Sequence, residues 1–209
     1  RMLARHCPFP HRLVCLSDRL KGFDPEVDAR PIPPGAAALA GLVTPEGGRF
    51  PTCYRRLWAF SPEARELGDR LVVLDLDVVV TGSLEPLLAY TAPFVGWRPL
   101  AGWGGTRRIG GGLYALTPGA RLDVWTDFVA HPGLAIATAR AAGFRGSDQA
   151  WMSFRLAADC PVFGPECGLY SIRDFDNGRR PCPADARLVQ FNGPVKPWQS
   201  TLSWARMAW

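Results

Sequence analysis

Apolar residues cluster in short runs along the chain, and prolines, glycines and charged residues separate these runs. Four runs have the length of short buried strands: residues 13–16, 94–97, 113–116 and 188–191. Three segments carry apolar residues at helical spacing: residues 54–60, 119–128 and 149–157. Residues 1–6 have the pattern of the end of a helix. Strands that alternate with helices predict a layered α/β fold, and we expect one domain over residues 1–209.

The strongest strand signal covers residues 70–80, and two acidic residues interrupt it. Asp75 and Asp77 follow an apolar run of four residues and precede a run of three. Side chains alternate between the two faces of a strand, so we expect both carboxylates to project together and Leu76 to point the other way. Open α/β sheets bind ligands at the carboxyl ends of their strands, and oxygen ligands favour Mg²⁺ or Mn²⁺.

Two chemistries use an aspartate pair of this kind. Phosphatases of the haloacid dehalogenase type use the first aspartate as a nucleophile and need a threonine two residues after the second, where this chain has Val79. Glycosyltransferases that use nucleotide-sugars hold a divalent ion on the donor diphosphate with the pair. The mismatch at Val79 favours the glycosyltransferase.

Composition and charge exclude several other classes. The chain has 209 residues and a formal net charge of +5, but its arginines are scattered and form no basic block, so we expect no nucleic-acid partner. No apolar run approaches the roughly 20 residues of a membrane span, and we predict no transmembrane segment. The six cysteines form no Cys-x-x-Cys pair, which argues against a zinc site and fits a reducing compartment. We therefore expect the protein in the cytoplasm or at the inner surface of the membrane.

Residues 71–88, LVVLDLDVVVTGSLEPLL, resemble the metal-binding segment of the GT-A fold glycosyltransferases, particularly the glycogenin and lipopolysaccharide galactosyltransferase-like family. Three further stretches resemble motifs of that family in order and spacing: residues 54–57 (YRRL), 146–149 (GSDQ) and 190–198 (QFNGPVKPW). The resemblance spans residues 10–200. It implies a mainly parallel, mixed sheet flanked by helices, in a Rossmann-like arrangement.

The resemblance also implies roles for individual residues. Asp75 and Asp77 would hold Mn²⁺ or Mg²⁺, with Gln190 or Asn192 as a further ligand. Residues that would contact the donor nucleotide-sugar, which we expect to be a UDP-sugar, are Arg56, Asp75, Gly111, Gly193 and Lys196. Asp148 and Gln149 would line the region of the transferred sugar and the acceptor. Lys196 is a compact positive charge suited to a diphosphate, and Gly193 allows close approach of the backbone to a ligand.

Two features depart from the family pattern. The family has a metal-binding histidine where this chain has Gln190, and a neutral amide oxygen leans toward Mg²⁺ over Mn²⁺. The first strand of the family, which contacts the nucleotide base, is not recognisable before Arg1. Either it lies outside this chain, or the base site is built differently; Asp18 is a candidate nucleotide contact.

The glycine-rich segment 102–112, GWGGTRRIGGG, lacks the strand-then-helix context of a dinucleotide-binding motif. We expect it to form a loop, in which Gly110, Gly111 and Gly112 let the backbone pass the donor sugar. Trp103, Arg107 and Arg108 are candidate acceptor contacts. Residues 19–51 also have the composition of a long loop.

The leading hypothesis is a metal-dependent glycosyltransferase that moves a sugar from a nucleoside-diphosphate donor to a hydroxyl of a glycan or another acceptor. If the family resemblance holds, the anomeric configuration is retained. Two alternatives stay open at this stage. One is a sugar- or nucleotide-binding module without catalysis, because the metal histidine is replaced, and the other is the phosphohydrolase.

Overall fold

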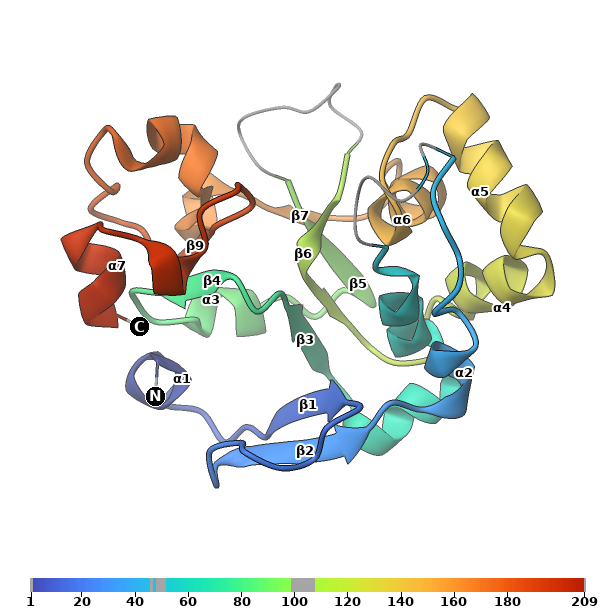
Figure 1. Ribbon diagram of the computed structural model, residues 1–209, viewed down its shortest axis with the longest axis horizontal. Coiled ribbons are helices and arrows are strands. Elements are labelled where there is room, and N and C mark those ends of the chain that lie inside the picture. The colour runs from blue at the N-terminus through green and yellow to red at the C-terminus, as the bar shows by residue number, and fades with distance from the viewer. Residues whose placement is uncertain (1, 46, 48–51, 99–107, 209) are drawn as a thin grey trace. The chain divides into compact units, whose positions relative to one another are not determined.

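The computed structural model describes residues 2–45, 47, 52–98 and 108–208 (Figure 1). These residues gather into two compact units, each assembled from segments that are not contiguous in the sequence. The first unit comprises Arg1–Phe9, Val72–Leu116 and Ala157–Trp209, and the second comprises Pro10–Leu71 and Thr117–Leu156. A single domain over residues 1–209 stays a prediction.

The first unit contains two small sheets. Its helices are α1 (Met2–His6), α3 (Glu85–Leu88), α7 (Ser203–Ala208) and the 3₁₀ helices η3 (Pro165–Cys167), η4 (Ile172–Gly178) and η5 (Pro197–Gln199). One sheet has the strand order β3 (Leu71–Leu74), β6 (Gly110–Leu116), β5 (Phe94–Trp97), β7 (Val162–Phe163), and the other has the order β4 (Val78–Val80), β9 (Leu188–Gln190), β8 (Leu169–Ser171). Strand β9 runs antiparallel to β4 and parallel to β8.

The sheet formed by β4, β9 and β8 is covered on both faces, and this explains its apolar sequence. Val78 and Val80 belong to one apolar cluster, which includes Leu113 and Phe163, whereas Val79 between them belongs to a second cluster. The second cluster includes Phe191 and side chains of α7, which lies beside this sheet in Figure 1. Strands buried on both faces read as continuous apolar runs rather than as an alternating pattern.

The second unit contains one two-stranded parallel sheet and a group of helices. The strands are β1 (Leu13–Ser17) and β2 (Val27–Pro31), and the helices are α2 (Pro34–Ala37), η1 (Tyr54–Phe60), η2 (Pro62–Leu67), α4 (Leu122–Ala130), α5 (Pro132–Ala141) and α6 (Asp148–Leu156). Figure 1 shows α4, α5 and α6 side by side. The rings of Tyr54 in η1 and Phe128 in α4 stack at 5.2 Å, and Trp151 in α6 packs on Phe128.

Several expected elements are confirmed, and others are wrong. The strands near residues 13, 94, 113 and 188 are present, as are the helical turns at 54–60 and the helices near 122 and 148. The segment 19–51 is not all loop, because it contains β2 and α2, and Gly110–Gly112 belong to β6 rather than to a loop. A large side chain lies over the first of these glycines, since a Cβ on Gly110 would be 2.6 Å from the ring of Trp97.

Both parallel and antiparallel pairings occur among the described strands: β1–β2, β5–β7 and β8–β9 are parallel, and β4–β9 and β5–β6 are antiparallel. All six cysteines lie in the described ranges, and none forms a disulfide. Within the described part of the chain, no helix has the length and the apolar character needed to cross a membrane.

Candidate donor-binding site

The two aspartates lie in a turn that joins strands of two different sheets. Strand β3 ends at Leu74 and β4 begins at Val78, so Asp75 and Asp77 lie outside both strands. The alternation of side chains along a strand therefore does not determine where the two carboxylates point, contrary to our expectation. Two backbone hydrogen bonds fix the turn: Asp75 N donates to Gly112 O at 2.9 Å, and Phe191 N donates to Asp77 O at 2.8 Å. Leu76 at the tip of the turn is 81% exposed.

The carboxylate of Asp75 accepts a hydrogen bond from Gln190. The amide nitrogen Nε2 of Gln190 lies 2.9 Å from Oδ2 of Asp75, and Gln190 is buried, opposite Val78 in the pairing of β4 with β9. Gly112 makes room for this amide, because a Cβ at position 112 would be 1.6 Å from Nε2. Gln190 therefore orients Asp75 with a donor group, at the position where the resembling family has a histidine.

The carboxylate of Asp77 is paired with an ammonium group. Nζ of Lys196 lies 2.6 Å from Oδ2 of Asp77 and donates a second, longer hydrogen bond to Phe191 O at 3.4 Å. The side chain of Asp77 is 16% exposed and that of Lys196 is 34% exposed. A charge-assisted hydrogen bond in partly shielded surroundings is stronger than one between neutral groups.

Asn192 and Gly193 lie between β9 and Lys196. Ser171 Oγ donates to Oδ1 of Asn192 at 2.8 Å, and the guanidinium of Arg173 donates to the backbone carbonyl of Asn192 at 2.7 Å. A Cβ on Gly193 would find open space, its nearest neighbour being Oδ1 of Asn177 at 3.9 Å. Sequence reasoning missed Ser171 and Arg173, since neither lies in a motif or an apolar pattern.

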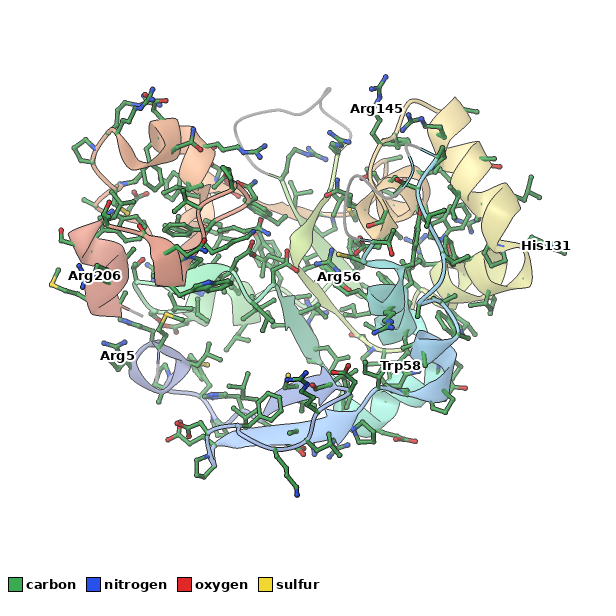
Figure 2. All side chains as sticks on the ribbon, viewed as in Figure 1. Arg5, Arg56, Trp58, His131, Arg145 and Arg206 are labelled. Carbon is green, nitrogen blue, oxygen red and sulfur yellow. The ribbon has the colours of Figure 1, made fainter. Side chains whose placement is uncertain are left out.

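A second group of predicted residues lies in the other unit. Arg56 extends from η1 (Figure 2), with Nε 2.9 Å from Oδ2 of Asp148 and one Nη donating to Oδ1 at 3.1 Å. The side chain of Asp148 is 1% exposed and also accepts a hydrogen bond from Ser147 Oγ at 3.0 Å. Burial and the charge of Asp148 raise the pKa of Tyr54 to about 12. The ion pair thus fastens the start of α6 to η1.

Gln149 is more accessible than Asp148. It is partly exposed, and its amide makes a long hydrogen bond of 3.5 Å to Arg145 O. Gly146, before the start of α6, has φ +101°, and a Cβ there would be 2.4 Å from Nε2 of Gln149. The turn that leads into α6 therefore favours glycine for its backbone conformation, and a side chain at position 146 would also displace the amide of Gln149.

The structure groups the predicted residues within each unit. The first unit brings together Asp75, Asp77, Gln190, Asn192, Gly193 and Lys196, with Gly111 buried in β6 beside Gly112. The second unit brings together Arg56, Asp148 and Gln149. Asp18 is exposed just after β1. Arg108 is partly exposed, whereas Trp103 and Arg107 lie outside the described residues.

The oxygen ligands around the turn of residues 75–77, the acidic turn, suit a hard cation. Among the described residues, no group of three or more His, Cys, Asp or Glu is placed to hold a metal ion. Mg²⁺, however, is commonly held by one or two carboxylates together with water and substrate phosphates, rather than by a complete protein cage. The two carboxylates and the amide oxygens of Asn192 and Gln190 fit that pattern, provided that the ion replaces the present partners of the carboxylates.

The phosphatase alternative lacks its hydroxyl group. Val79 of β4 occupies the position that would need a threonine, and its side chain is fully buried in the second apolar cluster.

No family model matches the chain, and no curated protein matches it in sequence. Solved structures do match. The crystal structure of the galactosyltransferase LgtC, in complex with donor and acceptor sugar analogs, aligns with a TM-score of 0.64 and 15% identity, over 100% of this chain and 84% of LgtC. The glycosyltransferase GlyE of Streptococcus pneumoniae TIGR4 aligns with a TM-score of 0.51 and 16% identity, over 75% of this chain and 41% of GlyE.

The likeness to LgtC establishes the fold. The chain has a mixed α/β fold of the GT-A type, as the sequence predicted. It spans most of the length of LgtC but only about two fifths of GlyE.

Proposed function

We propose that this protein is a glycosyltransferase that transfers a sugar from a nucleoside-diphosphate donor, a UDP-sugar, to a hydroxyl group of a glycan or another acceptor. One observation carries the proposal: the ammonium of Lys196 lies 2.6 Å from Oδ2 of Asp77, in the same turn as Asp75, whose carboxylate accepts a hydrogen bond from Gln190. This combination suits a diphosphate with its divalent cation. The GT-A type fold and the likeness to LgtC support the same class of reaction.

The residues of the first unit would act on the leaving diphosphate. Asp75 and Asp77 would hold Mn²⁺ or Mg²⁺, which supplies positive charge to the diphosphate when it is bound. Gln190 keeps Asp75 oriented, and Gly193 leaves the backbone of its loop open to a phosphate oxygen. Lys196 would stabilise the negative charge that develops as the sugar departs. Retention of the anomeric configuration follows from the family resemblance.

The second unit holds the residues that the family resemblance assigns to the transferred sugar and the acceptor. Gln149, which is partly exposed, is our candidate for contact with the sugar or the acceptor. Asp148 is buried and paired with Arg56, so we assign it a positioning role for Arg56 rather than a contact of its own. Arg56 is then the group of this pair to which the family resemblance assigns a contact with the nucleotide-sugar.

The test is a donor screen with purified protein. UDP-sugars and other nucleotide-sugars are incubated with Mn²⁺ or Mg²⁺, and released nucleoside diphosphate is measured together with its affinity by calorimetry. Since Asp77 lies at the locus and Asp159 is exposed and distant from it in sequence, Asp77→Asn should abolish turnover and Asp159→Asn should leave it unchanged. No binding of any nucleoside diphosphate, with or without metal, contradicts the proposal.

Gln190 favours one second candidate, a nucleotide-sugar-binding module. The residue gives Asp75 a hydrogen-bond donor instead of an imidazole ligand. Tight binding of a nucleotide-sugar without release of diphosphate, across donors and acceptors, would favour this module over the transferase. Hydrolysis of p-nitrophenyl phosphate that is lost in Asp75→Asn would instead support the phosphohydrolase hypothesis.

A further inference from the structure

The ammonium group of Lys196 contacts the carboxylate of Asp77, which is a proposed ligand of the divalent cation. Its ammonium lies 2.6 Å from Oδ2 of Asp77. A divalent ion and an ammonium compete for that oxygen, and the repulsion between their like charges makes each weaken the binding of the other. The acidic turn is therefore already neutralised in part by a cation of the chain itself.

The backbone around Lys196 is held, and the side chain is the part that can move. Arg173 holds the carbonyl of Asn192, Pro197 is buried, and Lys196 N donates to Oε1 of Gln199 at 3.3 Å. The ammonium ends a flexible stem of four carbons, and its side chain is 34% exposed. It can exchange one oxygen partner for another without a change in the loop.

A diphosphate offers the ammonium such a partner. Its oxygens carry more charge than the single carboxylate of Asp77, and open space at Gly193 lies three residues before Lys196. Once the ammonium turns to the diphosphate, Oδ2 of Asp77 is released for the divalent ion. Each ligand then favours the other through this one side chain.

We propose that Lys196 is an internal cation that blocks the metal position on Asp77 until a nucleoside diphosphate draws its ammonium away. This inference rests on the proposed function, because it takes the nucleoside diphosphate and the metal from there. It adds that Lys196 opposes binding of the metal alone while it supports binding of the diphosphate. Lys196 thus lowers the affinity for the metal alone and raises the affinity for the diphosphate.

The experiment measures Mn²⁺ and UDP separately. Free Mn²⁺ is followed by electron paramagnetic resonance during titration of the wild type, Lys196→Gln and Lys21→Gln, each with and without UDP. The chain has only two lysines, so Lys21→Gln, at an exposed position, removes the same charge elsewhere. Lys196→Gln should bind Mn²⁺ alone about tenfold more tightly and UDP about tenfold more weakly at saturating Mn²⁺, whereas Lys21→Gln should match the wild type.

A second measurement uses the wild type alone and does not depend on folding of a variant. Acetylation of Lys196 relative to Lys21 is followed by mass spectrometry. Saturating Mn²⁺ alone should displace the ammonium from Asp77 and raise acetylation of Lys196, and addition of UDP should lower it again.

A double variant serves as a control for the Mn²⁺ titration. Asp77→Asn combined with Lys196→Gln should lose the gain in Mn²⁺ affinity, since the gain depends on the carboxylate.

The outcomes separate this inference from the proposed function. If the wild type binds UDP with Mn²⁺, but Lys196→Gln binds Mn²⁺ alone no more tightly than the wild type, the internal-cation role is wrong and the donor site stands. An unchanged rate of acetylation at saturating Mn²⁺ would likewise exclude the internal-cation role. If the wild type binds no nucleoside diphosphate at all, the proposed function itself fails.

Discussion

At the scale of single residues, two glycines near the acidic turn have opposite surroundings. A side chain on Gly112 would overlap the buried amide of Gln190, whereas a side chain on Gly193 would meet open space. We expect Gly112→Ala to lower the free energy of unfolding by about 2 kcal/mol, because overpacking a closed site displaces its neighbours. Urea denaturation of both variants checks this.

Gly193→Ala is the matched control, and it should unfold at the same urea concentration as the wild type. It should nevertheless bind UDP more weakly if the backbone at 193 approaches a phosphate. Equal stability of Gly112→Ala and the wild type would mean that Gln190 can leave its hydrogen bond with Asp75 at no cost.

The ion pair of Arg56 and Asp148 gives a second prediction. Removal of one partner of a buried pair leaves an uncompensated charge, so Arg56→Gln should cost about 3 kcal/mol of stability. The double variant with Asp148→Asn should recover most of this loss, because no buried charge remains. Chemical denaturation of the wild type, both single variants and the double variant gives the coupling energy. Additive losses would show that the two side chains act independently.

The residues of the candidate site were chosen from motifs in the sequence, but the motifs did not predict the partners that the structure gives these residues. The acidic pair and Lys196 belong to local patterns that a single sequence displays. That Gln190 would donate to Asp75, or that Asn192 would be held by Ser171 and Arg173, depends on contacts between residues 19 to 115 positions apart. Such pairing is set by the register of strands, which no local pattern encodes.

At the scale of elements, charged residues join α4 to α6. Arg155 in α6 contacts the carboxylates of Asp123 at 2.9 Å and Asp127 at 2.6 Å, and Arg121 contacts Asp123 at 3.0 Å. The guanidinium of Arg155 also lies 5.3 Å from the ring centre of Trp151. Hydrogen bonds from Arg121 and Arg155, partly opposed by burial, lower the pKa of Asp123 to about 2.

This low pKa predicts a loss of stability in acid. A carboxyl group whose pKa is lower in the folded state stabilises the fold above its unfolded pKa, near 4, and this contribution disappears as the pH falls toward 2. Since Asp123 is 36% exposed, solvent screening reduces the effect to about 1 kcal/mol. Melting temperatures of the wild type and Asp123→Asn from pH 6 to pH 2 should converge as the pH falls. A constant difference would exclude the contribution.

Elements with a clear apolar pattern were predictable, and elements stabilised by neighbours were not. Strand β5 and helix α4 show their pattern locally, whereas β2, with sequence VDARP, contains two charged residues and a proline. Asp28 and Arg30 of β2 form an ion pair at 2.9 Å, so each charge is compensated by the other within the strand. Helix α5 buries only Ala135 and Ala139, so its periodicity is weak.

At the scale of the whole molecule, each compact unit is assembled from distant parts of the chain. The second unit combines residues 10–71 with residues 117–156, and the first combines three segments. A resemblance to a known family predicted the fold class, and the likeness to LgtC confirms it. The alternation of strands and helices predicted one domain over residues 1–209, which stays a prediction, and the long-range contacts that define the two units have no signature in the local sequence.

The discontinuous second unit leads to a last prediction, which concerns residues 117–156. This segment holds α4, α5 and α6, which have 9, 10 and 9 residues, and isolated helices of that length are marginal in water. In the folded chain, Tyr54 stacks on Phe128, Arg56 pairs with Asp148, and Trp58 lies in one apolar cluster with Trp125. Because all three partners come from η1, a peptide of residues 117–156 should show little helix by far-ultraviolet circular dichroism. A chain in which residues 10–71 are linked to residues 117–156 should regain the helical signal, and native-like helicity in the peptide alone would show that η1 is dispensable for these helices.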